Sequence, residues 1–279
     1  MKKMFFTMFC VASTKLSAQV AVNLPSDRPI DPLAAFQVCG TVRIDTLPGS
    51  LNPTHLLVLD ASDSLIHSIR LDSFVASIHK PAPLVRVYTI DTIWIKPPNL
   101  KYIIVEMVGA GGGGGGCYSY GGGAGAAGGY SKKLITAQFL AQQEQVFVGL
   151  GGLGGDPQFL GQDGGTSSFG VHCFATGGQG GRAQTTIINA TEGSLGGTAS
   201  GGDINLSGSG SGGAVGSGQS VYCGAASFFG GGASTPGLGS NGLNANGYGS
   251  GGSGGNCNGN FNRKGGNGAD GVVIVTEYY

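Results

Sequence analysis

The stretch that decides the fold is YIIVEMVGAGGGGGG, residues 102–116. Its first half, Tyr102 to Val108, is a mostly apolar strand that runs directly into polyglycine. A second apolar strand, GVVIVTEYY at residues 271–279, closes the chain. We therefore expect the two strands to pair in one small sheet, from which the glycine segments extend. The alternating residues 88–95, and the stretches 133–139 and 145–148, are predicted to be strands of the same sheet.

Glycine is concentrated in one part of the chain. It accounts for 57 of the 279 residues, and all of them except Gly40 and Gly49 lie between Gly109 and Gly271. Collagen requires glycine at every third position without a break, whereas here the glycines come in pairs and runs. A flexible linker would gain nothing from the large apolar residues, such as Tyr130 and Phe169, that recur among the glycines. The composition therefore indicates an ordered domain.

Segments without Cβ atoms can pack very closely in the polyproline II conformation. That helix has about three residues per turn and no internal hydrogen bonds. Its N–H and C=O groups must then find partners on neighbouring segments. The sequence thus predicts a mainly β fold with packed polyglycine II helices, which form a rigid scaffold with variable connecting loops.

The first 19 residues form a separate N-terminal segment with two possible roles. Lys2 and Lys3 precede an apolar run over residues 4–12, and Ser17-Ala18-Gln19 offers small residues for cleavage. This order is typical of a short secretory signal peptide. Lys15 and the short apolar run count against cleavage, and the alternative is a buried arm that stays on the protein.

Residues 20–87 are predicted to be a small β-rich attachment and oligomerisation module. Strands are expected at 36–44, 55–59 and 65–71, with the last two forming a hairpin, and Asp72 is expected to cap a short helix through Ile78. A module of this size buries little core, so association with other chains would stabilise it. The remainder, residues 88–279, is the glycine-rich domain.

Charge and hydropathy exclude two classes of partner. The chain carries 15 basic and 15 acidic residues and no clustered basic stretch, which excludes a nucleic-acid binder driven by counterion release. No apolar run approaches the roughly 18 residues that a membrane span needs.

Two glycine motifs imitate cofactor or metal sites. Residues 109–114 fit G-x-G-x-x-G, but a dinucleotide site needs a helix next, and polyglycine cannot form one. Residues 265–273 fit a calcium-binding nonapeptide, but such repeats act in tandem, and the only similar stretch, 151–159, is over a hundred residues away. We therefore expect no cofactor.

The cysteines and acidic residues give no catalytic or metal site. None of the six cysteines is spaced as C-x-x-C, which argues against structural zinc. They are expected to be reduced, or, in an exported protein, to form pairs among Cys117, Cys223 and Cys257 that join loops. Cys173 beside His172 suggests a nucleophile pair only remotely, and a small buried thiol is the expected alternative. The four histidines and 15 acidic residues form no compact cluster, so the sequence indicates no catalytic residue.

Several motifs, in order, resemble the glycine-rich domain of phage tail fibres and tail-tip adhesins. They are IWIKP (93–97), YIIVEMVGA before polyglycine (102–110), GGGAGAAGGYSK (121–132), VFVGLGG (146–152), GQDGGTSSFG (161–170), ATGGQGG (175–181) and GADGVVIV (268–275). The resemblance covers about residues 88–279. It implies polyglycine II packing, no catalysis, a virion location, other tail or baseplate proteins as partners, and a homotrimer or a cap on a trimeric fibre.

The resemblance also implies that loops at a fibre tip bind a host cell-surface receptor, either a glycan or an outer-membrane protein. Aromatic side chains give large contact area at low entropic cost, so the candidates are the loop aromatics and their neighbouring charges. These residues are Tyr118, Tyr120, Tyr222, Phe228, Phe229 and Phe261, with Arg263 and Lys264 as rim charges. The alternative is that the aromatics, Phe228 and Phe229 above all, plug the ends of the glycine layers.

Three functions follow from these observations. The first is a non-enzymatic phage tail-fibre or tail-tip receptor-binding protein. The alternative is a secreted bacterial surface adhesin or matrix protein, which the signal-like start favours. The third is an enzyme acting on surface glycans, which needs paired carboxylates that the glycine-rich half does not offer in sequence.

Overall fold

The computed structural model describes residues 55–59, 66–70, 82–185, 192–214, 222–257 and 262–279. The chain divides into two units, Met1–Lys80 and Pro81–Tyr279. In the first unit, β1 (His55–Leu59) pairs antiparallel with β2 (Ile66–Arg70), as the predicted hairpin requires. The strand predicted at 36–44 and the helix predicted from Asp72 to Ile78 lie outside the described residues.

The second unit contains two five-stranded antiparallel sheets and almost no helix. The first sheet has the order β11-β6-β5-β12-β3, comprising Ile204–Leu206, Tyr130–Thr136, Tyr102–Val108, Val272–Tyr278 and Leu84–Tyr88. The second has the order β10-β9-β8-β7-β4, comprising Ala199–Ser200, Cys173–Ala175, Ser167–Phe169, Gln143–Phe147 and Thr92–Ile95. Among the described residues, no helix is long and apolar enough to cross a membrane.

Alternating side chains of the two sheets share one core. In β5, Ile103, Val105 and Met107 are fully buried, whereas the residues between them are half-buried. They pack in one cluster with Trp94 of β4 and Phe169 of β8, whose rings meet edge to face at 5.7 Å. The period-two pattern of these strands therefore produces two facing layers, the β-sandwich.

The buried carboxylate of Glu277 joins the layers at a polar point. It accepts hydrogen bonds from Trp94 Nε1, Arg86 Nε and Tyr279 Oη, each at 2.8 Å. These three donors satisfy a group that would be costly to bury alone. The contact fixes β4 of one sheet against β12 and β3 of the other.

The strand predictions were correct in part. The pairing of the two strands that flank the glycines is confirmed, with Val108 opposite Val272. The predicted strand 88–95 is in fact divided, because β3 ends at Tyr88 in one sheet and β4 begins at Thr92 in the other.

Two further strands differ from prediction. The strand predicted at 133–139 starts earlier, at Tyr130, and its last residues form a 3-10 turn, Ala137–Phe139. The prediction that 145–148 extends the first sheet is wrong, because β7 lies in the second sheet. Val146 of β7 points into the shared core, so the strand covers the first sheet instead of lengthening it.

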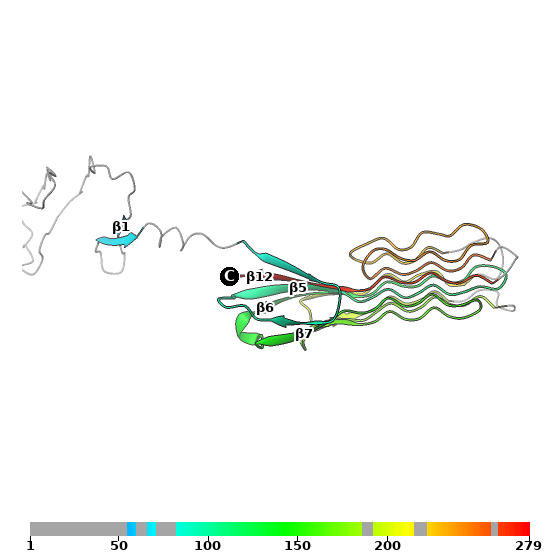
Figure 1. Ribbon diagram of the computed structural model, residues 1–279, viewed down its shortest axis with the longest axis horizontal. Coiled ribbons are helices and arrows are strands. Elements are labelled where there is room, and N and C mark those ends of the chain that lie inside the picture. Colours follow the sequence, from blue (N-terminus) through cyan, green and yellow to red (C-terminus); the bar gives the residue numbers. More distant parts are fainter. Residues whose placement is uncertain (1–54, 60–65, 71–81, 186–191, 215–221, 258–261) are drawn as a thin grey trace, which may run out of the picture. The chain divides into compact units, whose positions relative to one another are not determined.

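The glycine segments leave the sandwich at one end of its strands and return to the same end, as Figure 1 shows. For example, β5 continues into residues 109–116, and residues 122–129 lead back into β6. The pair 149–155 and 161–166 connects β7 to β8 in the same way. The long path from β11 to β12 contains the segments 207–214, 224–226, 231–235, 241–246, 250–256 and 263–270.

Backbone hydrogen bonds join these segments with a repeat of three residues. In segment 109–116, Ala110 and Gly113 donate to Gly165 and Gln162, while Gly111 and Gly114 donate to Ala269 and Gly266. Gly112 and Gly115 donate to Ala126 and Gly123. The carbonyls of the same segment accept from a further three segments, through the N–H groups of Gly152, Gly155, Gly178, Gly181, Gly252 and Gly255. Segment 109–116 is therefore bonded on all sides.

Close approach, not φ, is what requires glycine in these segments. A Cβ on Gly111 would lie 1.8 Å from the carbonyl oxygen of Ser250, and one on Gly113 would lie 2.1 Å from that of Leu153. Because the obstacle is backbone in each case, no side-chain rotation could relieve it.

Some backbone N–H groups of the glycine segments donate to side-chain oxygens instead of to the carbonyls of a neighbouring segment. Gly151 and Gly154 donate to the side-chain oxygens of Asp270 and Asn267, at 2.7 and 2.8 Å. Lys264 and Asn267 donate in the same way to Asn241 and Asn244, at 3.1 and 2.8 Å. In each pair the acceptors are three residues apart, so they follow the repeat of the backbone bonds.

We predict that Gly151→Ala and Gly178→Ala each lower the free energy of unfolding by roughly 1–3 kcal/mol through overpacking. Their added Cβ atoms would lie 2.1 Å from the carbonyl oxygen of Gly268 and 2.2 Å from that of Ala126. Gly231→Ala is the matched control, because nothing lies within 4 Å of its Cβ position. Denaturant unfolding measures all three, and equal stability of test and control variants would contradict the packing.

Candidate binding site at the distal turns

The ends of the glycine segments farthest from the sandwich bring together five stretches of the chain. We call residues 117–121, 184, 236–240, 256–257 and 263 the distal turns. Cys117 and Arg263 exchange backbone hydrogen bonds of 2.9 and 3.2 Å, and Cys257 donates to the Tyr120 carbonyl at 2.7 Å. Asn256 donates its backbone N–H to Ser240 at 3.0 Å. These bonds hold together loops that are far apart in sequence.

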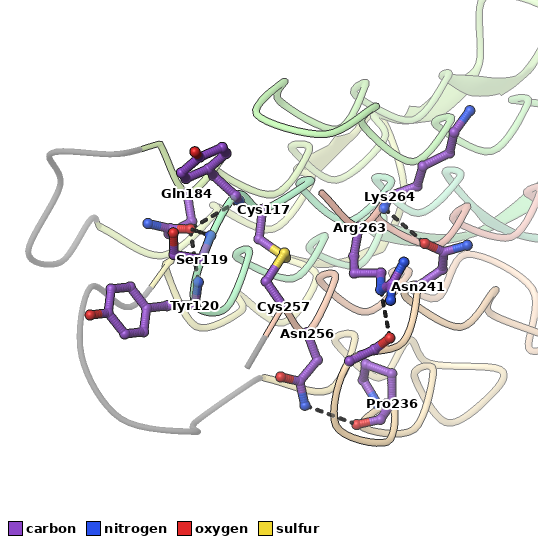
Figure 2. The surroundings of a disulfide bond; sticks show 12 residues. Cys117, Ser119, Tyr120, Gln184, Pro236, Asn241, Asn256, Cys257, Arg263 and Lys264 are labelled. Atoms are coloured by element: carbon purple, nitrogen blue, oxygen red, sulfur yellow. Dashed lines mark hydrogen bonds between the residues drawn. A yellow bond between two sulfur atoms is a disulfide. The ribbon is translucent and has the colours of Figure 1, made fainter. Parts of the chain in front are cut away.

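Gln184 shapes the turn that carries Tyr118 and Tyr120. Its side-chain oxygen accepts the N–H groups of Tyr118, Ser119 and Tyr120 at 3.0, 2.9 and 3.0 Å, as Figure 2 shows. The residue is only 2% exposed. One buried amide oxygen thus accepts from three successive N–H groups at a chain reversal, and the Tyr118 N–H also donates to the Gln184 backbone carbonyl at 3.1 Å.

A disulfide joins Cys117 to Cys257 at the same place, across a sequence separation of 140 residues. The cysteines were expected to be either reduced or joined in disulfides between loops, and Cys117 and Cys257 form such a disulfide. Cys223, the third candidate for pairing, is free and exposed. The structure thus selects one pair that spacing alone left open.

The two tyrosines of this turn present their rings to solvent. Tyr118 and Tyr120 are 40% and 39% exposed. In Figure 2 the Tyr120 ring points away from the disulfide. Both backbones are held by Gln184, so the rings project from a fixed turn.

The two predicted rim charges differ in their contacts. Arg263 is half-buried, and its Nε donates to the carbonyl of Gly239 within the distal turns. Lys264 is exposed and pairs with Asp156 at 2.6 Å. Both partners of that pair are largely in water, so it adds little stability. Lys264 therefore keeps a charge at the surface, while Arg263 also supports the fold.

The other predicted contact residues do not all join this site. Tyr222 is 42% exposed and lies over Gly212, where an added Cβ would be 2.2 Å from its ring. Phe261 lies outside the described residues.

Phe228 and Phe229 lie at the opposite end of the glycine segments, beside the first residue of β6. The Phe228 ring stacks on Tyr130 at 3.8 Å, and the Phe229 ring meets Tyr130 edge to face at 5.8 Å. Tyr130 also donates to Glu106 at 2.6 Å, and burial together with this bond raises the pKa of its hydroxyl. The two phenylalanines therefore pack at the sandwich end of the glycine segments and not at the distal turns.

The described residues hold no group of three His, Cys, Asp or Glu side chains that could bind a metal ion. His172 Nε2 lies 3.0 Å from Glu144, at the sandwich and not at the distal turns. Burial raises the pKa of the neighbouring Cys173 thiol to about 11, so it is protonated at neutral pH. What the distal turns offer chemically is aromatic surface, amide groups and one cation, which suits binding.

The model of a family described as a glycine-rich domain matches residues 88–278. The chain belongs to this glycine-rich domain family. The match covers both sheets apart from most of β3, together with all the glycine segments. No curated protein sequence matches the chain.

Sequence reasoning missed two parts of this glycine-rich domain. Gln184 carries no motif, and its role depends on a turn 64 to 66 residues away. The partner of Cys117 could not be chosen, because the glycine segments between the cysteines can be arranged in many ways. Tyr118 and Tyr120 were named as candidates only because they are aromatic residues in a loop between glycine runs.

We predict that Cys117→Ser with Cys257→Ser lowers the free energy of unfolding by about 2–4 kcal/mol, since a closed loop of this length restricts the unfolded chain. Thermal unfolding with and without reductant measures the effect in the wild-type protein. Cys223→Ser is the control and should unfold as the wild type does. A wild-type Tm that does not change on full reduction would refute the stabilising role.

Proposed function

We propose that this protein is a non-enzymatic phage tail-fibre or tail-tip protein that binds a host cell-surface receptor through its distal turns. The observation that carries the proposal is the pair of exposed tyrosines on a turn fixed by Gln184 and the Cys117–Cys257 disulfide. Rigid aromatic side chains at a protruding end are suited to recognition, because they lose little entropy on binding.

The scaffold proposed for this role is a bundle of polyglycine II helices. Its support is the three-residue repeat of the intersegment hydrogen bonds, which equals the repeat of that helix. Among the described glycines, positive φ occurs only at Gly170, Gly201, Gly239 and Gly249, so the packed segments have the negative φ that the helix requires. Such a bundle would keep its shape while the turns between helices vary.

A second candidate function is a secreted bacterial surface adhesin or matrix protein. The observation that favours it is the Cys117–Cys257 disulfide, because disulfides persist mainly in oxidising compartments. The signal-like residues 1–19 agree with export. N-terminal sequencing of the native protein separates the two proposals, since export would remove this segment.

The receptor-binding proposal predicts that Tyr118→Ala with Tyr120→Ala weakens adsorption to host cells. Losing aromatic anchors of this kind costs about 2 kcal/mol or more, or at least roughly tenfold in affinity. The Tm should change little, because exposed side chains are removed while the Gln184 bonds are made by backbone groups. Adsorption and Tm are measured on the same preparations.

The matched control is Phe228→Ala, which removes an exposed aromatic ring at the opposite end of the glycine segments. It should lower Tm through loss of the Tyr130 stacking and leave adsorption of the folded protein unchanged. Weaker adsorption in the control than in the double tyrosine variant would refute the proposed site.

We also propose that the full chain assembles as a homotrimer or as a cap on a trimeric fibre. The support is the small predicted core of residues 20–87 together with the resemblance to fibre proteins. Native mass spectrometry of the full-length chain should give three times the 27.8 kDa mass of the uncleaved monomer, or 1:3 stoichiometry with a fibre protein. A monomer that also fails to bind any trimeric tail protein would contradict assembly of this kind.

A further inference from the structure

Segment 250–256 is the centre of a ring of neighbouring segments, and the ring has one gap. The segment donates to 109–116 through the Gly252 N–H, and it accepts from 122–129 through the Gly125 N–H and from 263–270 through the Gly266 N–H. On its other side it bonds to 224–226, 231–235 and 241–246, through Gly251, Ala233 and Ser253. It is therefore enclosed in the same way as segment 109–116.

The neighbours of this central segment also bond to one another around the ring. Ala225 donates to Gly125 at 3.1 Å, and Gly224 donates to Ala233 at 2.8 Å. On the other side, Gly242 and Ala245 donate to Lys264 and Asn267, at 2.8 and 2.9 Å. Segments 231–235 and 241–246 are the exception, because no hydrogen bond joins them anywhere along their described length.

A groove of about 270 Å³ opens between these two segments, lined by Gly231, Gly232, Ala233, Ser234, Leu243, Asn244 and Asn246. The backbone N–H groups of Gly232, Ser234, Asn244 and Asn246 have no hydrogen-bond partner among the described residues. A Cβ on Gly231 would meet nothing within 4 Å. The groove is thus lined by backbone N–H groups without partners, and the space beside Gly231 is open.

We propose that this groove binds one extended glycine-rich peptide segment of a partner protein. Elsewhere in this bundle, backbone N–H groups of such segments commonly donate to another glycine segment or to a side-chain oxygen, as Gly151 does to Asp270 and Asn267 does to Asn244. The walls consist mostly of small residues, and a neighbour can approach backbone this closely only if glycine recurs along it. Peptides that add to exposed backbone edges in other proteins gain affinity in the same way, from main-chain hydrogen bonds.

This occupant differs in chemistry from the receptor proposed for the distal turns. The groove runs beside segments 231–235 and 241–246, and of its lining residues none belongs to the distal turns. The inference therefore does not depend on the identity of the receptor. It identifies a place where a glycine-rich chain of another assembly component would continue the hydrogen-bonded bundle.

The test uses the capped peptide (Ser-Gly-Gly)4, which repeats the SGGSGG of residues 250–255, added to the isotope-labelled full chain. We expect amide shifts in the NMR spectrum at residues 231–234 and 243–246, and none with (Ser-Ala-Ala)4. Gly231→Leu, which fills the groove, should raise Kd at least about tenfold. Gly237→Leu is the matched control, since its Cβ position meets only Ser240 Oγ at 3.7 Å, and it should bind as the wild type does.

Three results would overturn the proposal. The first is the absence of shifts at millimolar peptide, and the second is equal binding by the Gly231→Leu variant. The third is a different occupant. Shifts at these residues that depend on protein concentration without peptide would show that a second copy occupies the groove. Shifts caused by a neutral oligosaccharide and not by the peptide would assign the groove to a glycan.

Discussion

The rest of the structure depends on the hydrogen-bonding demand of extended glycine segments. Such a segment makes no bonds within itself, so each N–H and C=O must be met from outside. Segment 109–116 meets this demand with neighbours on every side, and added Cβ atoms would collide with backbone oxygens at about 2 Å. Glycine is costly to order, and here the loss is offset by the number of bonds and contacts that close approach allows.

The β-sandwich supplies what the glycine segments cannot supply for themselves, namely a register. Uniform glycine carries no side chains that distinguish one alignment of neighbouring segments from the next. The alternation of Ile103, Val105 and Met107 against Val273 and Val275 fixes β5 against β12, because a slip by one residue would expose the core. The glycine segments then start from fixed positions, and the disulfide and Gln184 fix the far end.

The sequence allowed the flanking strands, the ordered glycine domain and the exposure of Tyr118 and Tyr120 to be predicted, because each depends on local pattern or composition. It did not show that β7 belongs to a second sheet, because a short strand has the same alternation of buried and exposed residues in either sheet. The Cys117–Cys257 pair, the role of Gln184 and the packing of Phe228 on Tyr130 depend on which segments lie side by side. Glycine repeats do not encode that order.

The pairing of β3 with β12 determines how this unit would carry mechanical force. The chain enters at Leu84, which lies opposite Glu277, whereas the glycine segments leave near Val108 and Val272 at the other end of the strands. A pull between the distal turns and the residues that precede Leu84 would therefore act along the strands, at right angles to their hydrogen bonds. All the bonds between β3 and β12 would be loaded together in shear, so the sheet would resist detachment far better than a ladder opened one bond at a time.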